Sequence, residues 1–299
     1  MEPRTRGRPR GLFVGLCTLD VVQLVDRVPG PDEKLTARDQ LVTAGGPAAN
    51  AAVTFAHLGG VARLLTAVGS HPLGETVRAD LDRAGVAVTD LAAGRDEPPA
   101  VSSVLVTAGT GERAVASTNA RGQRLGPPPD PDALLSACDI VQFDGHHPAL
   151  ALATARAARA AGRRTVLDGG SWKPGTEDLL PYIDVAVCSA AFRPPGTAET
   201  DGTLRFLRDH GVTWVAVSQG PRPLVWAGPD GGGGTVEVPA VHVVDTLGAG
   251  DVLHGALTHG LARHTELTGP AFTDALRAAA ALAARSCTSF GTRAWMRKG

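Results

Sequence analysis

The chain has 299 residues, which is enough for one large α/β domain or two small ones. A formal net charge of −1 gives no reason to expect nucleic acid or an anionic membrane as partner, and no apolar run is long enough to predict a membrane span. Four cysteines without CxxC spacing argue against a disulfide framework or a zinc site, so we expect a protein of the reducing cytoplasm.

The N-terminal stretch is predicted to be a disordered basic tail over residues 1–10, because arginines alternate there with small residues and two prolines. Residues 11–17 form an apolar run that predicts a buried first strand. Asp20 follows it, where open α/β sheets place ligand-binding groups. From about 21 to 43, and again from about 100 to 118, short β-type runs alternate with turn residues. These segments predict a small sheet that serves as a lid over the strand ends.

A helix is predicted after Gly45, Gly46 and Pro47, where an Ala-rich segment begins and Gly59 ends it. Asn50 lies in its first turns, and its amide can both donate to and accept from ligand hydroxyls. The alternative is an asparagine that is merely tolerated near a helix start.

Strands and helices alternate with short connections from about residue 139 onward. The expected strands lie at 139–143, 164–167, 185–188 and 212–217, and the expected helices near 150–161, 177–182, 203–210, 249–263 and 270–287. This alternation predicts a doubly wound, mainly parallel α/β sheet with helices on both faces, to which the small lid sheet is added.

The stretch from Val243 to Asp251 predicts a strand, a turn of very small residues and a helix start. Gly248, Ala249 and Gly250 leave their backbone N–H groups free to approach a phosphate at the positive end of the helix. Asp251 lies in the first helical turn, where it can accept the proton of an attacking hydroxyl. The alternative is an ordinary loop with a capping aspartate and two turn glycines.

Two motifs together resemble the signatures of the ribokinase-like, or phosphofructokinase-B type, carbohydrate kinases. They are Gly45-Gly46-x-x-x-Asn50 before the Ala-rich helix and, about 200 residues later, Asp245-Thr246-x-Gly248-Ala249-Gly250-Asp251. The resemblance covers nearly the whole chain beyond residue 10 and identifies 11–299 as a kinase domain. It implies transfer of the γ-phosphoryl of ATP to a small sugar, with Mg²⁺ and in some relatives a potassium-like ion. Short stretches of the sequence are also similar to sulfofructose kinases and ketohexokinases. Among possible phosphoryl acceptors, we therefore place the primary hydroxyl of a ketose first.

The resemblance also implies roles for single residues. Asp251 is the general base, and the backbone amides up to Gly250 form the anion hole. The implied substrate-binding residues are Asp20, Gly45, Gly46, Asn50, Asn119, Arg121 and Asp144. The implied nucleotide-binding residues are Ser218, Gly220, Thr246, Gly248, Gly250, Cys287 and Gly291. Asp245 is implied beside the monovalent ion. For Arg121 and Asp144, a solvated loop side chain is the alternative.

Some features of the family are missing. Where many members carry an Asn-x-x-Glu pair, this chain has Ser189 and Phe192, and a glycine near the nucleotide is replaced by Pro223. We therefore expect the metal ion to be held mainly by ATP and water. A nucleoside kinase of the same fold and a non-catalytic sugar- or nucleotide-binding protein are the alternatives. Exposed edges of the lid sheet predict a homodimer.

Overall fold

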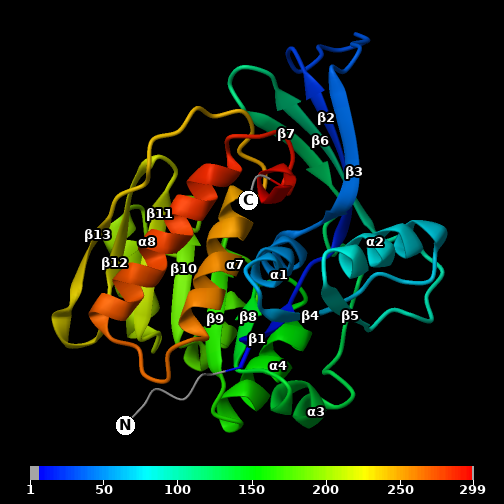
Figure 1. Ribbon diagram of the computed structural model, residues 1–299. Coiled ribbons are helices and arrows are strands. Elements are labelled where there is room, and N and C mark those ends of the chain that lie inside the picture. Colours follow the sequence, from blue (N-terminus) through cyan, green and yellow to red (C-terminus); the bar gives the residue numbers. More distant parts are fainter. Residues whose placement is uncertain (1–6, 298–299) are drawn as a thin grey trace.

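The computed structural model describes residues 7–297, in which two sheets and the helices around them form the molecule (Figure 1). The large sheet has nine strands within that range, in the order β13-β12-β11-β10-β9-β8-β1-β4-β5. Their bounds are β1 (Arg10–Val14), β4 (Val61–Thr66), β5 (Val86–Asp90), β8 (Ile140–Phe143), β9 (Arg164–Gly169), β10 (Val185–Ser189), β11 (Trp214–Gln219), β12 (Arg222–Ala227) and β13 (Gly233–Val236). All neighbours from β5 to β11 pair in parallel, and β12 and β13 add an antiparallel edge.

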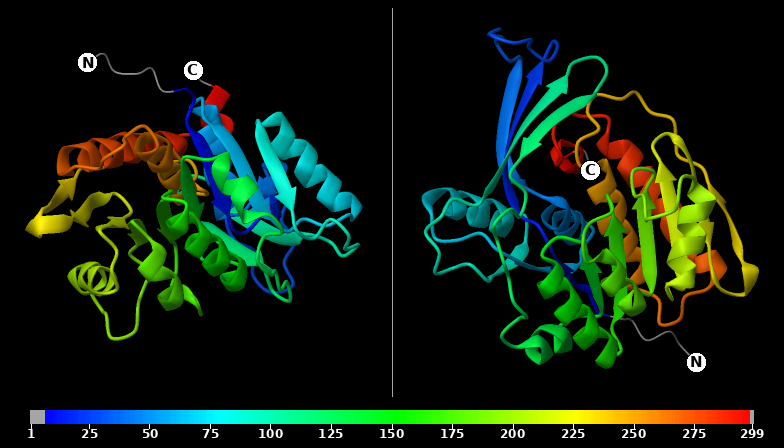
Figure 2. Two further views of the ribbon diagram at one scale, coloured as in Figure 1. Left: turned by 90° about the horizontal axis from the view of Figure 1, so that it is seen from below. Right: turned by 180° about the vertical axis from the view of Figure 1, so that it is seen from behind.

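Helices cover both faces of this sheet (Figure 2). One face is covered by α1 (Pro47–His57), α2 (Pro72–Arg83), α7 (Ala249–Leu261) and α8 (Gly269–Ser286), and the other by α3 (Pro131–Ser136), α4 (Pro148–Ala160), α5 (Thr176–Leu179) and α6 (Thr200–Asp209). Short 3₁₀ turns are η1 (Leu180–Tyr182), η2 (Pro229–Gly231) and η3 (Ala294–Arg297). Strand β1 is buried on both sides, because Phe13 packs into one core while Leu12 and Val14 pack into the other. The prediction of a doubly wound α/β sheet is confirmed.

The small sheet stands above the carboxyl ends of the large one (Figure 1). It consists of β3 (Asp39–Gly45), β2 (Thr18–Val25), β6 (Ala100–Thr107) and β7 (Arg113–Ser117), in the order β3-β2-β6-β7. One of its faces is apolar, with Val22, Val104 and Val106 packed against Leu247 and Phe290 from the C-terminal third of the chain. The predicted second sheet is therefore present, and its apolar face rests on the loops that precede α7 and follow α8.

Several local expectations differ from the structure. Residues 1–6 of the predicted tail lie outside the described residues, and the rest of the predicted tail differs from the expectation. Arg8 donates a hydrogen bond to the carbonyl of Gly59, and Arg10 already belongs to β1. The expected strand at Val243 and Val244 is absent from the described secondary structure, because the N–H of Val244 donates to a carbonyl at the end of α8 rather than to a neighbouring strand. Asp20 lies inside β2 rather than in a loop after β1.

Several elements have no counterpart in the sequence analysis, among them α2, β5, α3 and the antiparallel strands β12 and β13. In α2 only Gly74, Val77 and Leu81 are buried, and charged residues fill most of the other positions. Its apolar stripe is therefore too narrow to predict a helix from periodicity alone. No helix within residues 7–297 combines the length and apolar character that crossing a membrane requires.

Candidate active site

The N-termini of α1 and α7 meet at the carboxyl ends of the central strands, beneath the small sheet (Figure 1). Their close approach depends on small residues. A Cβ added to Gly255 of α7 would lie 2.4 Å from the carbonyl oxygen of Ala51 in α1. Because these backbones touch, the side chain one turn before Gly255 in α7 can reach the side chain just before Ala51 in α1.

Asn50 of α1 and Asp251 of α7 form this contact. The Nδ2 of Asn50 donates to Oδ2 of Asp251 at 2.8 Å, although the residues are 201 positions apart. The Oδ1 of Asn50 is buried, and nothing in residues 7–297 donates to it. A buried acceptor without a donor costs about 1–3 kcal/mol, so this oxygen is well placed to accept from a ligand hydroxyl.

The electrostatic environment of Asp251 favours a base that works near neutral pH. Burial raises the pKa of this carboxyl to about 7, and the negative charge of Asp168 adds to the increase. The hydrogen bond from Asn50 and the imidazole of His254 oppose it. A general base is most effective when its pKa lies close to the working pH.

Asp168 and His254 lie close enough to Asp251 to shift its pKa and form a buried pair that the sequence analysis did not select. The Nδ1 of His254 lies 2.7 Å from the carbonyl oxygen of Gly250 and 3.3 Å from Oδ2 of Asp168. Its Nε2 lies 2.9 Å from the carbonyl oxygen of Val187. Both ring nitrogens therefore face oxygens, and burial raises the pKa of the Asp168 carboxyl that lies against this ring.

Sequence signals for these residues were present but weak. His254 follows Asp251 by three positions, and Asp168 ends the predicted strand at 164–167. Lys173 is a third residue near the site that the sequence analysis did not select. Its Nζ donates to the carbonyl oxygens of Asp144 and Ser171 at 3.3 Å. Nothing in spacing shows that β9 and α7 bring Asp168 and His254 together, because that contact depends on the tertiary fold.

The turn before α7 presents unpaired backbone amides. Gly248 adopts a left-handed conformation with φ of 72°, and an added Cβ would lie 2.8 Å from Thr292. No acceptor within residues 7–297 bonds to the N–H groups of Gly248, Gly250 and Asp251. These donors lie at the positive end of a 13-residue helix, which suits an anion such as a phosphoryl group. Ala249, the other residue expected here, has a 3.4 Å contact from its N–H to the carbonyl of Thr246.

Asp245 fixes this turn to the C-terminal segment. Its Oδ1 accepts from the N–H of Leu247 and its Oδ2 from the N–H of Gly291, both at 2.8 Å. The carbonyl of Cys287 accepts from the N–H groups of Val244 and Asp245. Five of the expected nucleotide residues are thereby brought into one neighbourhood: Thr246, Gly248, Gly250, Cys287 and Gly291.

The two remaining expected nucleotide residues lie further along the sheet. Ser218 is in β11, where its Oγ donates to the carbonyl of Cys188 at 3.4 Å. Gly220, with φ of 65°, makes the tight turn between β11 and β12. Within residues 7–297, neither residue is hydrogen-bonded to the turn before α7.

Asp20 and its neighbours form the sugar side of the candidate site. The Oγ1 of Thr18 donates to Oδ1 of Asp20 at 2.6 Å, and burial raises the pKa of this carboxyl. An added Cβ at Gly45 would lie 1.8 Å from Oδ2 of Asp20, so this position has no room for any side chain. Gly46, with φ of 93°, begins α1 and brings Asn50 into the same region.

Asp144 has a full set of backbone partners. Its Oδ2 accepts from the N–H groups of Leu16 and Ala48, at 2.8 and 3.2 Å, and its Oδ1 accepts from the N–H of His146 at 2.9 Å. These bonds tie the end of β8 to the start of α1. The structure therefore gives Asp144 partners that position the site.

Asn119 and Arg121 are not brought into the cluster around Asp251. They lie on an exposed turn after β7, with Asn119 at φ of 49°. Within residues 7–297, neither side chain has a hydrogen bond or ion pair to the residues around Asp251.

The positions of the missing Asn-x-x-Glu pair are filled by side chains of another kind. Ser189 donates from Oγ to the carbonyl of Gly170, and Phe192 is buried against Trp172 at a ring-centroid distance of 5.3 Å. Among residues 7–297, no group of three or more His, Cys, Asp and Glu side chains is arranged to hold a metal ion.

Comparisons with known proteins agree with this geometry. Residues 10–298 match the family model of the pfkB carbohydrate kinases. The chain is 33% identical over 161 residues to the ATP-dependent ribose-1-phosphate kinase of Halopiger xanaduensis, a match that spans 54% of each chain. It is 23% identical to the ribokinase of Haemophilus influenzae, over 94% of this chain and 92% of that one.

Among solved structures, a crystal structure from Agrobacterium tumefaciens of a protein provisionally described as a ribokinase is similar at a TM-score of 0.84. The two chains are 28% identical, and the match covers 98% of each. The expected resemblance is confirmed by a family model that spans nearly the whole sequence and by a fold shared over the same length. The chain belongs to the pfkB family of carbohydrate kinases.

Proposed function

We propose that the protein transfers the γ-phosphoryl of ATP to a primary hydroxyl of a small sugar, with a ketose or ketose derivative as the first candidate. The contact between Asn50 and Asp251, beside unpaired amides at the start of α7, carries this proposal. It combines a base, an acceptor for a neighbouring hydroxyl and an anion-binding turn in one place. These are the parts that phosphoryl transfer to an alcohol requires.

The reaction follows from the positions of these groups. Asp251 accepts the proton of the attacking hydroxyl, and its pKa of about 7 leaves a large ionised fraction at neutral pH. Asn50 holds a neighbouring hydroxyl through its free Oδ1, and Asp20 accepts from a further one. The amides of Gly248 and Gly250 stabilise negative charge on the transferring group.

The residues of the turn before α7 suit ATP, because Gly248 and Gly250 offer unpaired backbone donors and the space beside Gly250 is open to phosphate oxygens. ATP supplies the phosphoryl group, and Mg²⁺ held mainly by phosphate oxygens and water offsets its charge. Both oxygens of Asp245 already accept amides, so a potassium-like ion there would rely chiefly on backbone carbonyls.

A nucleoside kinase of the same fold is the second candidate within the family. It needs an aromatic surface for the base, but Phe13 in β1 and Phe143 in β8 are fully buried in the core. This burial favours a sugar without a base as acceptor.

An acceptor screen tests the proposal. ADP release is measured with ATP, Mg²⁺ and a panel of ketoses and their anionic derivatives, ribose, ribose 1-phosphate and nucleosides. Phosphorylation of a ketose supports the proposal, and turnover confined to nucleosides or to aldose derivatives contradicts its substrate class. Sugar binding without ADP release from any acceptor would instead identify a non-catalytic binding protein.

We also propose that the protein is a homodimer of the cytoplasm. The edge strands of the small sheet, β3 and β7, carry unpaired backbone groups that a second copy can cover. Light scattering coupled to size-exclusion chromatography measures the mass directly, and a monomer at micromolar concentration would contradict this part of the proposal.

A further inference from the structure

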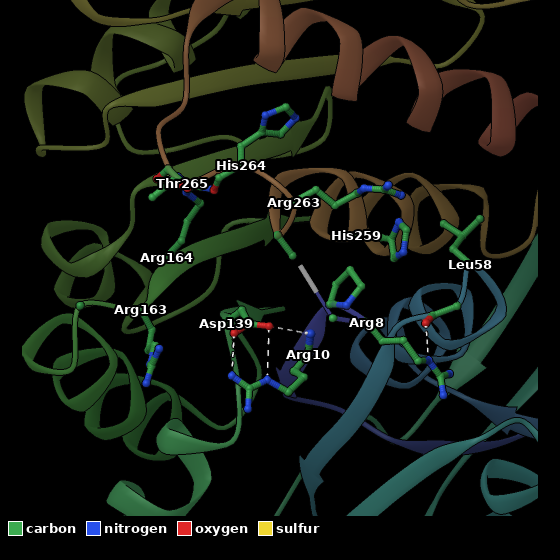
Figure 3. A pocket seen from close by; sticks show the side chains of 15 residues that line it. Arg8, Arg10, Leu58, Asp139, Arg163, Arg164, His259, Arg263, His264 and Thr265 are labelled. Carbon is green, nitrogen blue, oxygen red and sulfur yellow. Dashed lines mark hydrogen bonds and ion pairs between the residues drawn. The ribbon is translucent and has the colours of Figure 1, made fainter. Parts of the chain in front are cut away.

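A second pocket lies at the opposite edge of the large sheet from Asp251. It opens at the amino ends of β1, β8 and β9 and has a volume of about 1270 Å³ (Figure 3). Its walls are the end of α1, the end of α7 and the turns at 162–164 and 262–265. The volume is sufficient for a ligand of nucleotide size.

The lining of this pocket is strongly basic. Among the described residues that line it, five arginines face a single carboxylate, that of Asp139. The arginines are Arg8, Arg10, Arg163, Arg164 and Arg263. Two histidines, His259 and His264, also line it. The charge excess is therefore a local feature of one pocket in a chain whose formal net charge is −1.

Three of the arginines build the walls. Arg8 donates to the carbonyl that follows α1, at 2.8 Å, and Arg164 donates to the carbonyl of Leu261 at the end of α7, at 2.7 Å. Arg10 forms an ion pair with Asp139 at 2.8 Å. Cations at the negative ends of helices are stabilising, so these three have a structural role.

Arg163 and Arg263 are different, because no hydrogen bond or ion pair to their side chains exists within residues 7–297. The Nε of Arg163 is buried without an acceptor. In Figure 3 the two side chains come from separate turns, with the ion pair of Arg10 and Asp139 between them. The charge of Arg163 lowers the pKa of Asp139, so the two side chains interact electrostatically without a direct ion pair. A buried donor of a charged group without an acceptor is costly, and an anionic oxygen that reached Arg163 would reduce this cost.

The charge of Arg263 also affects the pKa of the neighbouring His259. Burial lowers the pKa of His259, and the charge of Arg263 lowers it further. His259 is therefore neutral at pH 7, and the guanidinium groups are the cations that remain for a ligand.

We propose that this pocket is a second, non-catalytic binding site for a small compound with several phosphate charges. Guanidinium groups bind phosphate oxygens in pairs of parallel hydrogen bonds, and the terminal Nη groups of Arg163 and Arg263 make no hydrogen bond within residues 7–297. A nucleoside polyphosphate and a sugar phosphate share this chemistry. The pocket lies across the full thickness of the domain from Asp251, so it is distinct from the proposed catalytic site.

Isothermal titration with inorganic pyrophosphate tests this proposal without requiring turnover. The proteins compared are the parent, Arg163→Gln combined with Arg263→Gln, and a control, Arg205→Gln, whose exposed side chain on α6 also has no partner within residues 7–297. We expect a binding event in the parent and the control that the double variant weakens by about tenfold or more. Its affinity should fall as salt is raised.

Equal pyrophosphate affinity in all three proteins would overturn the proposal, since the catalytic anion site would then account for all binding. Far-ultraviolet circular dichroism verifies the fold of each variant, and Arg263→Gln alone, at an exposed position, replaces the double variant if that one does not fold. Titrations with ADP and with fructose 6-phosphate then distinguish a nucleotide from a sugar phosphate as the preferred ligand.

Discussion

The buried carboxyl of Asp251 is proposed to serve catalysis, and its burial in ionised form lowers the stability of the fold. We predict that Asp251→Asn lowers kcat by about 10²–10⁴-fold, because a positioned base is lost, and leaves ATP affinity nearly unchanged. The Nδ2 of Asn50 keeps an acceptor in this variant, because the asparagine that replaces Asp251 still has an amide oxygen. Single-turnover kinetics and ATP titration separate the two effects, and a kcat close to that of the parent would show that another group is the base.

The same substitution should stabilise the fold. The pKa of Asp251 rises from 3.8 to about 7 on folding, so between these pH values the folded state holds a proton that the unfolded state has released. The free energy of unfolding therefore falls as pH increases through this window, and the full penalty remains above it. We expect Asp251→Asn to gain roughly 2–4 kcal/mol at pH 8 and little at pH 4. Urea unfolding at both pH values measures this, and equal gains would contradict the assigned ionisation.

Asp168 provides the matching test of charge. Its carboxylate raises the pKa of Asp251, so Asp168→Asn should move the acid limb of the kcat/KM profile to lower pH. A merely structural role would lower activity without moving this limb. The profile is measured between pH 5 and 9, and an unchanged midpoint at reduced rate would exclude electrostatic coupling between the two residues.

At the scale of elements, the site depends on how closely α1 and α7 approach. Gly255→Ala places a Cβ 2.4 Å from the carbonyl of Ala51, so the helices must separate and the contact between Asn50 and Asp251 must lengthen. We predict a loss of about 1–3 kcal/mol in stability and a marked loss of kcat. Gly202→Ala in α6 is the control, because its nearest neighbour would lie at 3.6 Å. Unchanged turnover in Gly255→Ala would show that the site tolerates displacement of these helices.

Elements with a strong local pattern were predictable from the sequence, and elements defined by their partners were not. The glycine pair before α1 and the turn before α7 can be recognised from their residue types. In each, the backbone adopts a conformation or makes a close contact that only small residues allow. Asn50 and Asp251 were selected because each lies in the first turns of the helix that follows one of these stretches. By contrast, Asp168 and Lys173 join the site only because parallel strands end at one edge.

Tertiary hydrogen bonds account for two features that the sequence does not show. Asp144 follows a strand as a ligand-binding residue would, and three backbone amides also donate to its oxygens, which no spacing rule reveals. Val243 and Val244 have β-branched side chains, but the carbonyl at the end of α8 takes the place of a neighbouring strand. In both cases tertiary hydrogen bonds decide the outcome, and local propensity does not include them.

At the scale of the whole molecule, the small sheet is fastened to the turn that precedes α7. The Nη1 of Arg113 in β7 donates to Oγ1 of Thr246 at 2.9 Å, and this hydroxyl donates to the carbonyl of Gly111 at 3.0 Å. Leu247 and Phe290 pack beneath the same sheet. The sheet that covers the proposed sugar is thus joined to the residues proposed to hold the phosphates, which favours closure over both substrates together.

Arg113→Ala tests whether this fastening keeps water from the transferring phosphoryl group. Without the bond to Thr246, the small sheet is held less firmly, so water competes better with the sugar hydroxyl. We expect ATP hydrolysis without sugar to rise several-fold relative to sugar phosphorylation, while Arg38→Gln, at an exposed ion pair of the same sheet, leaves this ratio unchanged. Coupled assays of ADP release with and without acceptor give the ratio. An equal ratio in both variants and the parent would show that water is excluded by the packing of Leu247 and Phe290 rather than by the polar fastening.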